Sequence, residues 1–97
     1  MIKSQITLKQ LEAFAFVVDT GTFRAAAFAL GTTQPNISAR ITALESALKV
    51  TLLIRDAGSV RLTADGKKLL VKAREVLWAG EALIEEAGRQ ELIEETL

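Results

Sequence analysis

The apolar residues of the chain recur at the three- and four-residue spacing of a helix in three separate stretches. The first predicts a helix over residues 8–19, because Thr7 and Gln10 form the capping-box pattern of a helix start. Residues 20–22, Thr-Gly-Thr, supply a break and a new N-cap. An alanine-rich second helix is then predicted over residues 23–30.

A tight turn is expected to separate the second helix from a third. Gly31 accepts the positive φ that often ends a helix, and Thr33 can cap the helix that follows. Pro35, the only proline, suits a first helical turn, where its missing N–H costs nothing. The third helix is therefore predicted to begin at Gln34 or Pro35 and to end at about Leu48.

After the third helix the pattern changes to that of short strands. Two β-prone pieces at residues 51–54 and 60–62 flank a turn-forming segment at residues 56–59, which predicts a small hairpin. Thr63 then caps a last helix that is predicted over residues 64–91. At 1.5 Å per residue this helix would span about 40 Å, more than so small a core can cover.

This order of elements predicts the fold class. Two short helices joined by a Gly-containing turn, with small Ala27 before it and apolar Ile37 after it, fit a helix-turn-helix, although a plain helical hairpin would fit these positions equally well. The following hairpin favours the first interpretation, since few other folds have that order. We expect a mainly α protein with a small β-hairpin. A winged helix-turn-helix DNA-binding domain would span residues 1–63 and a linker or dimerisation helix residues 64–97.

Charge is divided unevenly along the chain, although its formal net charge is zero. Residues 1–74 hold eleven basic and five acidic residues, whereas residues 75–97 hold one basic and seven acidic residues. A basic front segment can neutralise DNA phosphates, and an acidic rear segment would be repelled by them. Taken alone, the same split would also fit ordinary solvated surface charge.

The composition argues against several classes of function. With no Cys and no His, the chain has no disulfide framework, no thiolate metal site and no imidazole base. No metal, no cofactor and no enzyme activity are therefore expected. The longest apolar run is far shorter than a membrane span, and a secretion signal is not evident. We expect a soluble, cytoplasmic protein without a membrane partner.

A run of residues matches a known pattern in order and spacing. It comprises Leu11, Phe14, Gly21, Thr22, Phe23, Ala26, Ala27, Leu30, Thr33, Gln34, Pro35, Ile37, Ser38, Ile41, Leu44, Glu45, Leu48, Val50, Leu52, Arg55, Val60, Arg61, Leu62, Thr63 and Gly66. This run resembles the N-terminal part of LysR-type bacterial transcription regulators, over roughly residues 8–75.

The resemblance implies sequence-specific binding of double-stranded DNA by a homodimer. Its linker helices would pair antiparallel, and the full-length protein would assemble further to a tetramer. A C-terminal domain like a periplasmic binding protein would bind a small-molecule effector. That domain would begin at about the position where this chain stops, so we expect the chain to be the DNA-binding portion of a longer regulator.

By position, the resemblance assigns DNA contacts to the turn and the start of the third helix: Thr33, Gln34, Pro35, Asn36 and Ser38, with Arg40 behind them. The chemistry of these side chains suits the task. Gln34 and Asn36 can pair with an adenine edge, Arg40 can reach guanine or phosphate, and Pro35 can touch a thymine methyl. Thr33 can equally serve as a cap alone, and Pro35 as a simple helix start.

Two arginines of the wing, Arg55 and Arg61, are expected beside the groove that the third helix enters. There their charge would meet phosphate or the minor groove and add affinity without reading much sequence. Either one could also be a solvated arginine on an exposed hairpin.

Four positions depart from the usual pattern of the family. Ala39 stands where arginine is common, which would shift base readout to Arg40. Leu53 replaces a common Phe, Ser59 replaces a basic wing-tip residue, and Phe28 is apolar at an exposed helical position.

An apolar stripe on the last helix predicts a dimer interface, because three short helices cannot bury its whole length. The stripe consists of Leu69, Ala73, Val76, Leu77, Gly80, Leu83, Ile84 and Ala87. Trp78 could be a further anchor or ordinary domain packing. The competing function is a winged-helix adaptor that binds protein and no DNA, which the uncharged Ala39 and Ser59 keep open.

Overall fold

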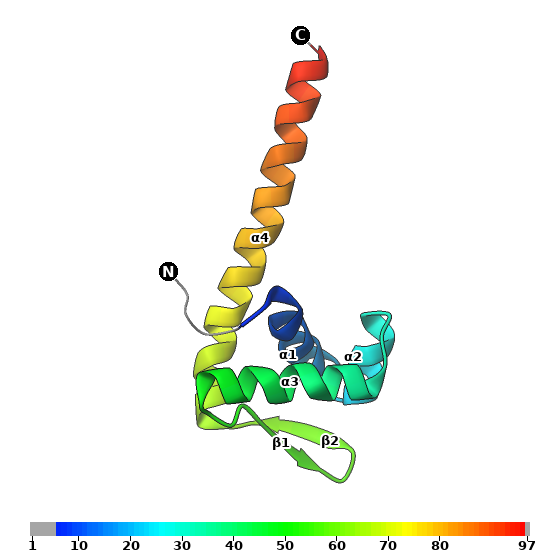
Figure 1. Cartoon of the computed structure of the whole chain (residues 1–97), viewed down its shortest axis with the longest axis vertical. Helices are drawn as coiled ribbons and strands as arrows, with labels where there is room; N and C mark the ends of the chain where they lie inside the picture. The colour runs from blue at the N-terminus through cyan, green and yellow to red at the C-terminus, as the bar shows by residue number, and fades with distance from the viewer. Residues whose placement is uncertain (1–5, 97) are drawn as a thin grey trace.

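The computed structural model describes the backbone of residues 6–96 and the side chains of residues 6–89. Three helices form a compact cluster, a hairpin lies along one side of the third, and a fourth helix runs out of the cluster (Figure 1). In chain order the elements are α1 (Leu8–Thr20), α2 (Phe23–Ala29), α3 (Gln34–Leu48), β1 (Leu53–Asp56), β2 (Ser59–Leu62) and α4 (Ala64–Thr96). The predicted fold class, mainly α with a hairpin and a long last helix, is confirmed.

The four helices of the described chain begin in the same way. A threonine precedes each helix, and its side-chain oxygen accepts a hydrogen bond from the backbone N–H three residues later, over 2.9–3.2 Å. These threonines are Thr7, Thr22, Thr33 and Thr63. At the first helix the capping box is complete, since Gln10 Oε1 also accepts the N–H of Thr7. These caps satisfy donors that a helix start leaves unpaired, and the predicted starts of all four helices are confirmed.

The core lies around α1, which packs against α2, α3 and α4. Its largest fully buried side chains are Phe14 and Val17 of α1, Ile37 and Leu44 of α3, and Leu52, which precedes β1. The helix-turn-helix pair of α2 and α3 is therefore held on one side of α1. No helix in the described part of the chain is long and apolar enough to cross a membrane.

The hairpin differs from the prediction in where its strands begin and end. Leu53 pairs with Leu62 and Asp56 with Ser59, so the first strand starts two residues later than predicted and the turn is shortened to two residues. The reason lies at Leu52, whose side chain is in the core and whose N–H donates to Glu45 Oε2 of α3 over 2.7 Å. An amide committed to α3 is not available to β2.

The last helix starts in close contact with the segment before β1. Thr63 donates its backbone N–H to the carbonyl oxygen of Leu52 over 3.0 Å and its hydroxyl to the carbonyl of Thr51. One turn later, Gly66 is buried, and a Cβ built there would overlap the carbonyl oxygen of Leu52 and touch the side chain of Leu62. This position of α4 therefore requires glycine for lack of space.

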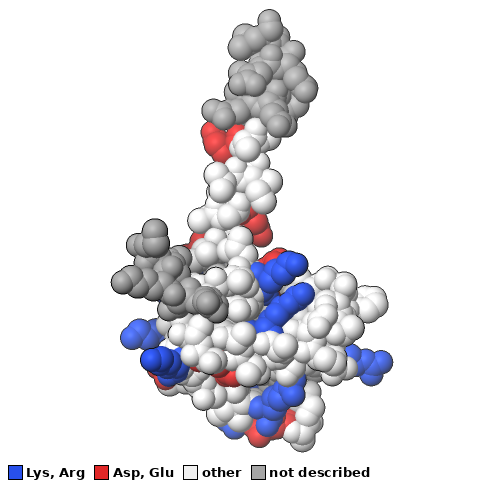
Figure 2. All heavy atoms as spheres, in the orientation of Figure 1, with Lys and Arg blue, Asp and Glu red and all other residues white. Residues whose placement is uncertain are grey.

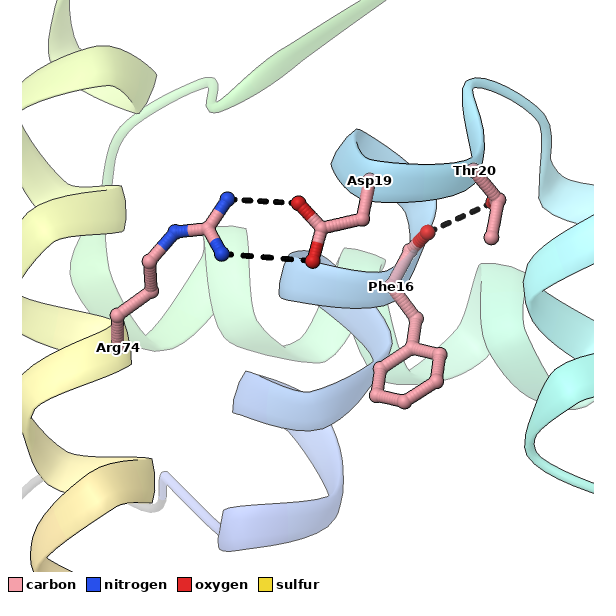
Figure 3. A network of polar contacts seen from close by, with 4 residues as sticks. All are labelled: Phe16, Asp19, Thr20 and Arg74. Carbon is pink, nitrogen blue, oxygen red and sulfur yellow. Dashed lines mark hydrogen bonds and ion pairs between the residues drawn. The ribbon is translucent and has the colours of Figure 1, made fainter.

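An ion pair adds a second link between α4 and the helix cluster. Arg74 approaches Asp19, in the last turn of α1, with both terminal nitrogens, over 2.7 and 3.3 Å (Figure 3). Nearby, Thr20 returns its hydroxyl to the carbonyl of Phe16. Because both charged side chains are partly exposed, the pair contributes about 1 kcal/mol or less.

We predict that Gly66→Ala destabilises the protein by about 2–3 kcal/mol, because backbone or helix must shift to admit the methyl group. The measurement is the free energy of unfolding from urea denaturation. Gly88→Ala is the matched control in the same helix, where a Cβ meets nothing and alanine is the better helix former. Equal effects of the two substitutions would contradict the close contact.

Candidate nucleic-acid interface

The helix α3 turns one face toward the core and the opposite face to solvent. Ile37, Ile41 and Leu44 are buried on the inner side. The outward face, as we call it, consists of exposed residues at helical spacing: Pro35, Ala39, Thr42, Ala43 and Ser46. These side chains are small and uncharged, so the outward face can approach another surface closely.

The polar residues predicted to bind DNA lie on both flanks of the outward face. With 100° between successive residues, Gln34 and Ser38 fall on the flank toward the hairpin, and Asn36 and Arg40 fall on the other. Gln34 and Asn36 are exposed, whereas Ser38 and Arg40 are half-buried. The structure thus brings all four next to the same exposed face, with Arg40 about 100° from Ala39.

The turn before α3 is organised by its own polar groups. Thr33 is exposed and caps the helix, and the side-chain amide of Asn36 donates to the hydroxyl oxygen of Thr32 over 3.0 Å. Thr33 therefore has the capping role that the sequence allowed. The hydrogen of its hydroxyl is still available for an outside acceptor, since only the oxygen is used by the cap.

A hollow of about 450 Å³ lies between the hairpin and the starts of α2 and α3. Its lining contains two guanidinium groups and no carboxylate: Thr22, Phe23, Arg24, Gln34, Arg55, Gly58, Ser59 and Val60. We call it the wing hollow. A smaller hollow of about 150 Å³ shares Phe23 and Arg55 with it and is lined on the α3 side by Ser38, Ile41, Thr42 and the acidic Glu45. The wing hollow is thus a basic depression on the hairpin side of α3, next to the start of the helix at Gln34.

The two predicted wing arginines lie on opposite faces of the hairpin. The pairing places Arg55 across from Val60, on one face, and Arg61 across from Ile54, on the other. Arg55 packs over the ring of Phe23, 3.5 Å from its centroid, within the wing hollow. Arg61 instead pairs with Asp56, Nε to Oδ2, over 2.8 Å. The structure therefore brings Arg55 next to α3 and does not bring Arg61 there.

Two further residues belong to this region and were missed by the sequence reasoning. Arg24, exposed at the start of α2, lines the wing hollow, and Thr42 lies on the outward face beside Ser38. The four-residue spacing from Ser38 could have identified Thr42, because it places both on one side of the helix. Nothing in the local sequence marks Arg24, which reaches the hollow only through the packing of α2 on α3.

Charge follows the division seen along the sequence. On the face shown in Figure 2, Lys and Arg side chains are spread over the compact part together with some Asp and Glu, while the described protruding part of α4 shows Asp and Glu. Among residues 75–89 there are four glutamates and one arginine. Within the described residues, no three potential ligands of the His, Cys, Asp or Glu type gather as a metal site would require.

The fold and this surface together define a class. A helix-turn-helix whose second helix exposes a small, uncharged face, with polar flanks and a basic hollow under an adjoining hairpin, is a winged helix-turn-helix DNA-binding domain.

Comparison with known proteins identifies the family. Residues 8–67 match the model of the bacterial regulatory helix-turn-helix proteins of the lysR family. The chain belongs to this family. A probable hydrogen peroxide-inducible genes activator of Streptomyces viridosporus is 45% identical over 85 residues, which are 88% of this chain and 27% of that protein. The uncharacterized regulator YvbU of Bacillus subtilis is 45% identical over 73 residues, 74% of this chain and 25% of YvbU. The chain thus spans about a quarter of either relative.

Solved structures of the family have the same fold. The oxidized form of OxyR from Corynebacterium glutamicum has a TM-score of 0.84 at 35% identity, over 89% of this chain and 28% of that chain. The DNA-binding domain of CbnR in a DNA complex has a TM-score of 0.78 at 35% identity, over 88% and 99%. The DNA-binding domain of BenM with benA site 1 DNA has a TM-score of 0.80 at 30% identity, over 87% and 94%.

The tip of the hairpin offers a direct test of its geometry. Ala57 and Gly58 both have positive φ, 42° and 87°, as a two-residue hairpin turn of the mirror-image type requires. We predict that Ala57→Asn stabilises the protein by about 0.5 kcal/mol, because asparagine tolerates this conformation better than alanine. Thermal unfolding measures the change, and Ala79→Asn, inside α4, should destabilise. A lower melting temperature for Ala57→Asn would contradict the turn geometry.

Proposed function

We propose that this chain is the DNA-binding portion of a transcription regulator that binds double-stranded DNA sequence-specifically as a homodimer. The observation that carries the proposal is the exposed outward face of α3 beside the basic wing hollow. Two structural neighbours at 30% identity or more are DNA complexes of DNA-binding domains, which supports it. The family is one of regulators and not of enzymes, so we propose no catalytic activity and a place of action in the cytoplasm, with the DNA.

In this proposal α3 lies in the major groove of the duplex. Its small outward face permits close approach, and Gln34, Asn36 and Arg40 reach base edges from the two flanks. Thr33, Pro35 and Ser38 contact the backbone or base methyl groups at the start of the helix. Such a helix reads bases only where its register is fixed by phosphate contacts.

The wing supplies phosphate or minor-groove contacts. Arg55 does so from the wing hollow, on the α3 side. Arg61 would act from the opposite face of the hairpin, and its pairing with Asp56 must first be exchanged for a phosphate. We therefore assign the larger share of the wing's contribution to Arg55.

The stripe on α4 is proposed as the dimer interface. Its first part serves the chain's own domain: Ala73 is buried in the core, and Leu69 and Leu77 pack against it. Beyond these, Leu83 and Ile84 are 72% and 75% exposed. An isolated monomer would leave this apolar surface in water at a cost of about 25 cal/mol for each Å². A second copy of α4 would cover it.

Charge supports an antiparallel arrangement of the two helices. Residues 64–74 carry four basic residues and one acidic residue, whereas residues 75–89 carry four acidic residues and one basic residue. Antiparallel packing places the basic half of one helix along the acidic half of the other. We propose a tetramer and effector binding only for a regulator in which this domain is joined to a C-terminal effector-binding domain.

Base-reading and backbone-contacting residues should respond differently to substitution. Arg55→Gln is expected to weaken binding to specific and scrambled duplexes alike and to lower the log–log salt slope by about 1. Gln34→Ala or Arg40→Gln should lower the preference for the specific duplex, by about 1–3 kcal/mol for a lost bidentate contact. Fluorescence anisotropy across a salt series, on duplexes from DNA beside the protein's own gene, measures both quantities.

The same titrations can reject the proposal. A folded, dimeric protein that binds neither duplex at low salt would exclude DNA binding and favour the adaptor function. If the wing and helix substitutions had the same effect on specificity, the assignment of their roles would be wrong.

The interface on α4 can be tested with a pair of adjacent residues. Leu83→Glu should raise the dimer dissociation constant at least about a hundredfold, because each of two copies loses an apolar contact of about 1.5–3 kcal/mol. Ala82→Glu is the control, since Ala82 is exposed on the side of the helix away from the stripe. Sedimentation equilibrium measures both. If Ala82→Glu dissociated the dimer and Leu83→Glu had no effect, the dimer interface would not lie on the apolar stripe of α4.

A further inference from the structure

We infer that Arg24 of α2 and Arg55 of the wing grip a single DNA backbone phosphate in the wing hollow, and that the ring of Phe23 holds Arg55 in position for this contact. The inference rests on the proposed DNA-binding function and adds to it a defined anion site and a residue, Arg24, that neither helix α3 nor the wing supplies.

The chemistry of the wing hollow selects an anion. Its lining holds two guanidinium groups and no carboxylate. Thr22 adds a hydroxyl whose oxygen accepts the N–H of Ala25 but whose hydrogen is free to donate. Guanidinium groups bind phosphate through two parallel N–H donors, which gives geometry as well as charge. A volume of about 450 Å³ is ample for one phosphate with accompanying water.

The donors of both arginines are uncommitted in the described structure. Arg61 pairs with Asp56 and Arg74 with Asp19, whereas neither Arg24 nor Arg55 has a carboxylate partner among the described residues. These two side chains therefore retain their donors for a ligand. A carboxylate need not be displaced before a phosphate binds.

Phe23 restricts where the Arg55 guanidinium can lie. Phe23 is 8% exposed and belongs to the core, so its ring is held in place by packing. The guanidinium lies over the ring at 3.5 Å from the centroid. Stacking of this kind covers the flat face of the guanidinium and leaves N–H groups at its edge available. Phe23 is thus a positioning residue that acts through Arg55.

The place of the hollow identifies the phosphate as part of a backbone strand. The hollow opens between the hairpin and the helix-turn-helix, beside the outward face of α3. When α3 occupies the major groove, one sugar–phosphate strand must pass along its border. A phosphate held from α2 on one side and from the wing on the other would fix the register in which α3 meets the bases.

The test uses the full chain and the specific duplex on which it binds best, with one phosphate at a time replaced by an uncharged methylphosphonate. Arg24→Gln and Arg55→Gln should each lose roughly five- to tenfold in affinity on the unmodified duplex. At one phosphate position in each half-site, the methylphosphonate should lower the affinity of the wild-type protein by a similar factor. On that modified duplex, Arg24→Gln and Arg55→Gln should cause no further loss of affinity. Arg89→Gln, which removes a charge from the distal part of α4, should retain the wild-type response at every position.

The outcomes separate this inference from the function on which it rests. Failure of the wild type to bind any specific duplex contradicts the proposed function itself. Two outcomes overturn the shared phosphate site alone, provided that the wild type binds the duplex specifically. In the first, Arg24→Gln binds as tightly as the wild type. In the second, the two arginine variants respond to different phosphate positions. Phe23→Leu, once circular dichroism shows that it is folded, should bind the unmodified duplex more weakly and should be insensitive to the same methylphosphonate. The double variant with Arg55→Gln should bind no more weakly than Arg55→Gln alone. An additive loss would remove Phe23 from the account.

Discussion

The structure depends on the place where three elements meet at Leu52. Its side chain is buried, its N–H donates to the Glu45 carboxylate of α3, and its carbonyl accepts the N–H of Thr63 at the start of α4. Gly66 allows α4 to pass directly against that carbonyl. Because both backbone groups of one residue are used by different helices, α3, the hairpin and α4 are fixed relative to one another.

This junction gives the interface its shape. The hairpin leaves the junction at Leu53 and runs back along α3, so the face that carries Arg55 is turned toward Phe23 and the start of α2. The same junction directs α4 away from the helix cluster (Figure 1), which leaves the apolar side chains of Leu83 and Ile84 exposed. The proposed reading helix, the proposed phosphate contact and the proposed dimer helix are therefore held as one unit, and the spacing of two half-sites on DNA would follow from it.

Local chemistry explains how much could be predicted. The four threonine caps, Pro35 and the glycines of the turns act within a few residues, and from them the helix starts and the order of elements were predicted correctly. The strand boundaries were predicted wrongly because a residue distant in the sequence determines where the first strand begins. The strand begins at Leu53 because Glu45 takes the amide of Leu52.

The same limit applies to the candidate site. Helical spacing sufficed to gather Gln34, Asn36, Ser38 and Arg40 around one face of α3. Strand register, which depends on tertiary contacts, decides that Arg55 and Arg61 face opposite ways.

To test the rigidity of the Leu52 junction directly, native-state hydrogen exchange of the amides of Leu52 and Thr63 is the measurement of choice. Both should exchange only through global unfolding, with free energies equal to that from urea denaturation. An opening free energy at these two amides several kcal/mol below that of global unfolding, while α1 stays protected, would show that the junction opens locally. That result would contradict the rigid junction.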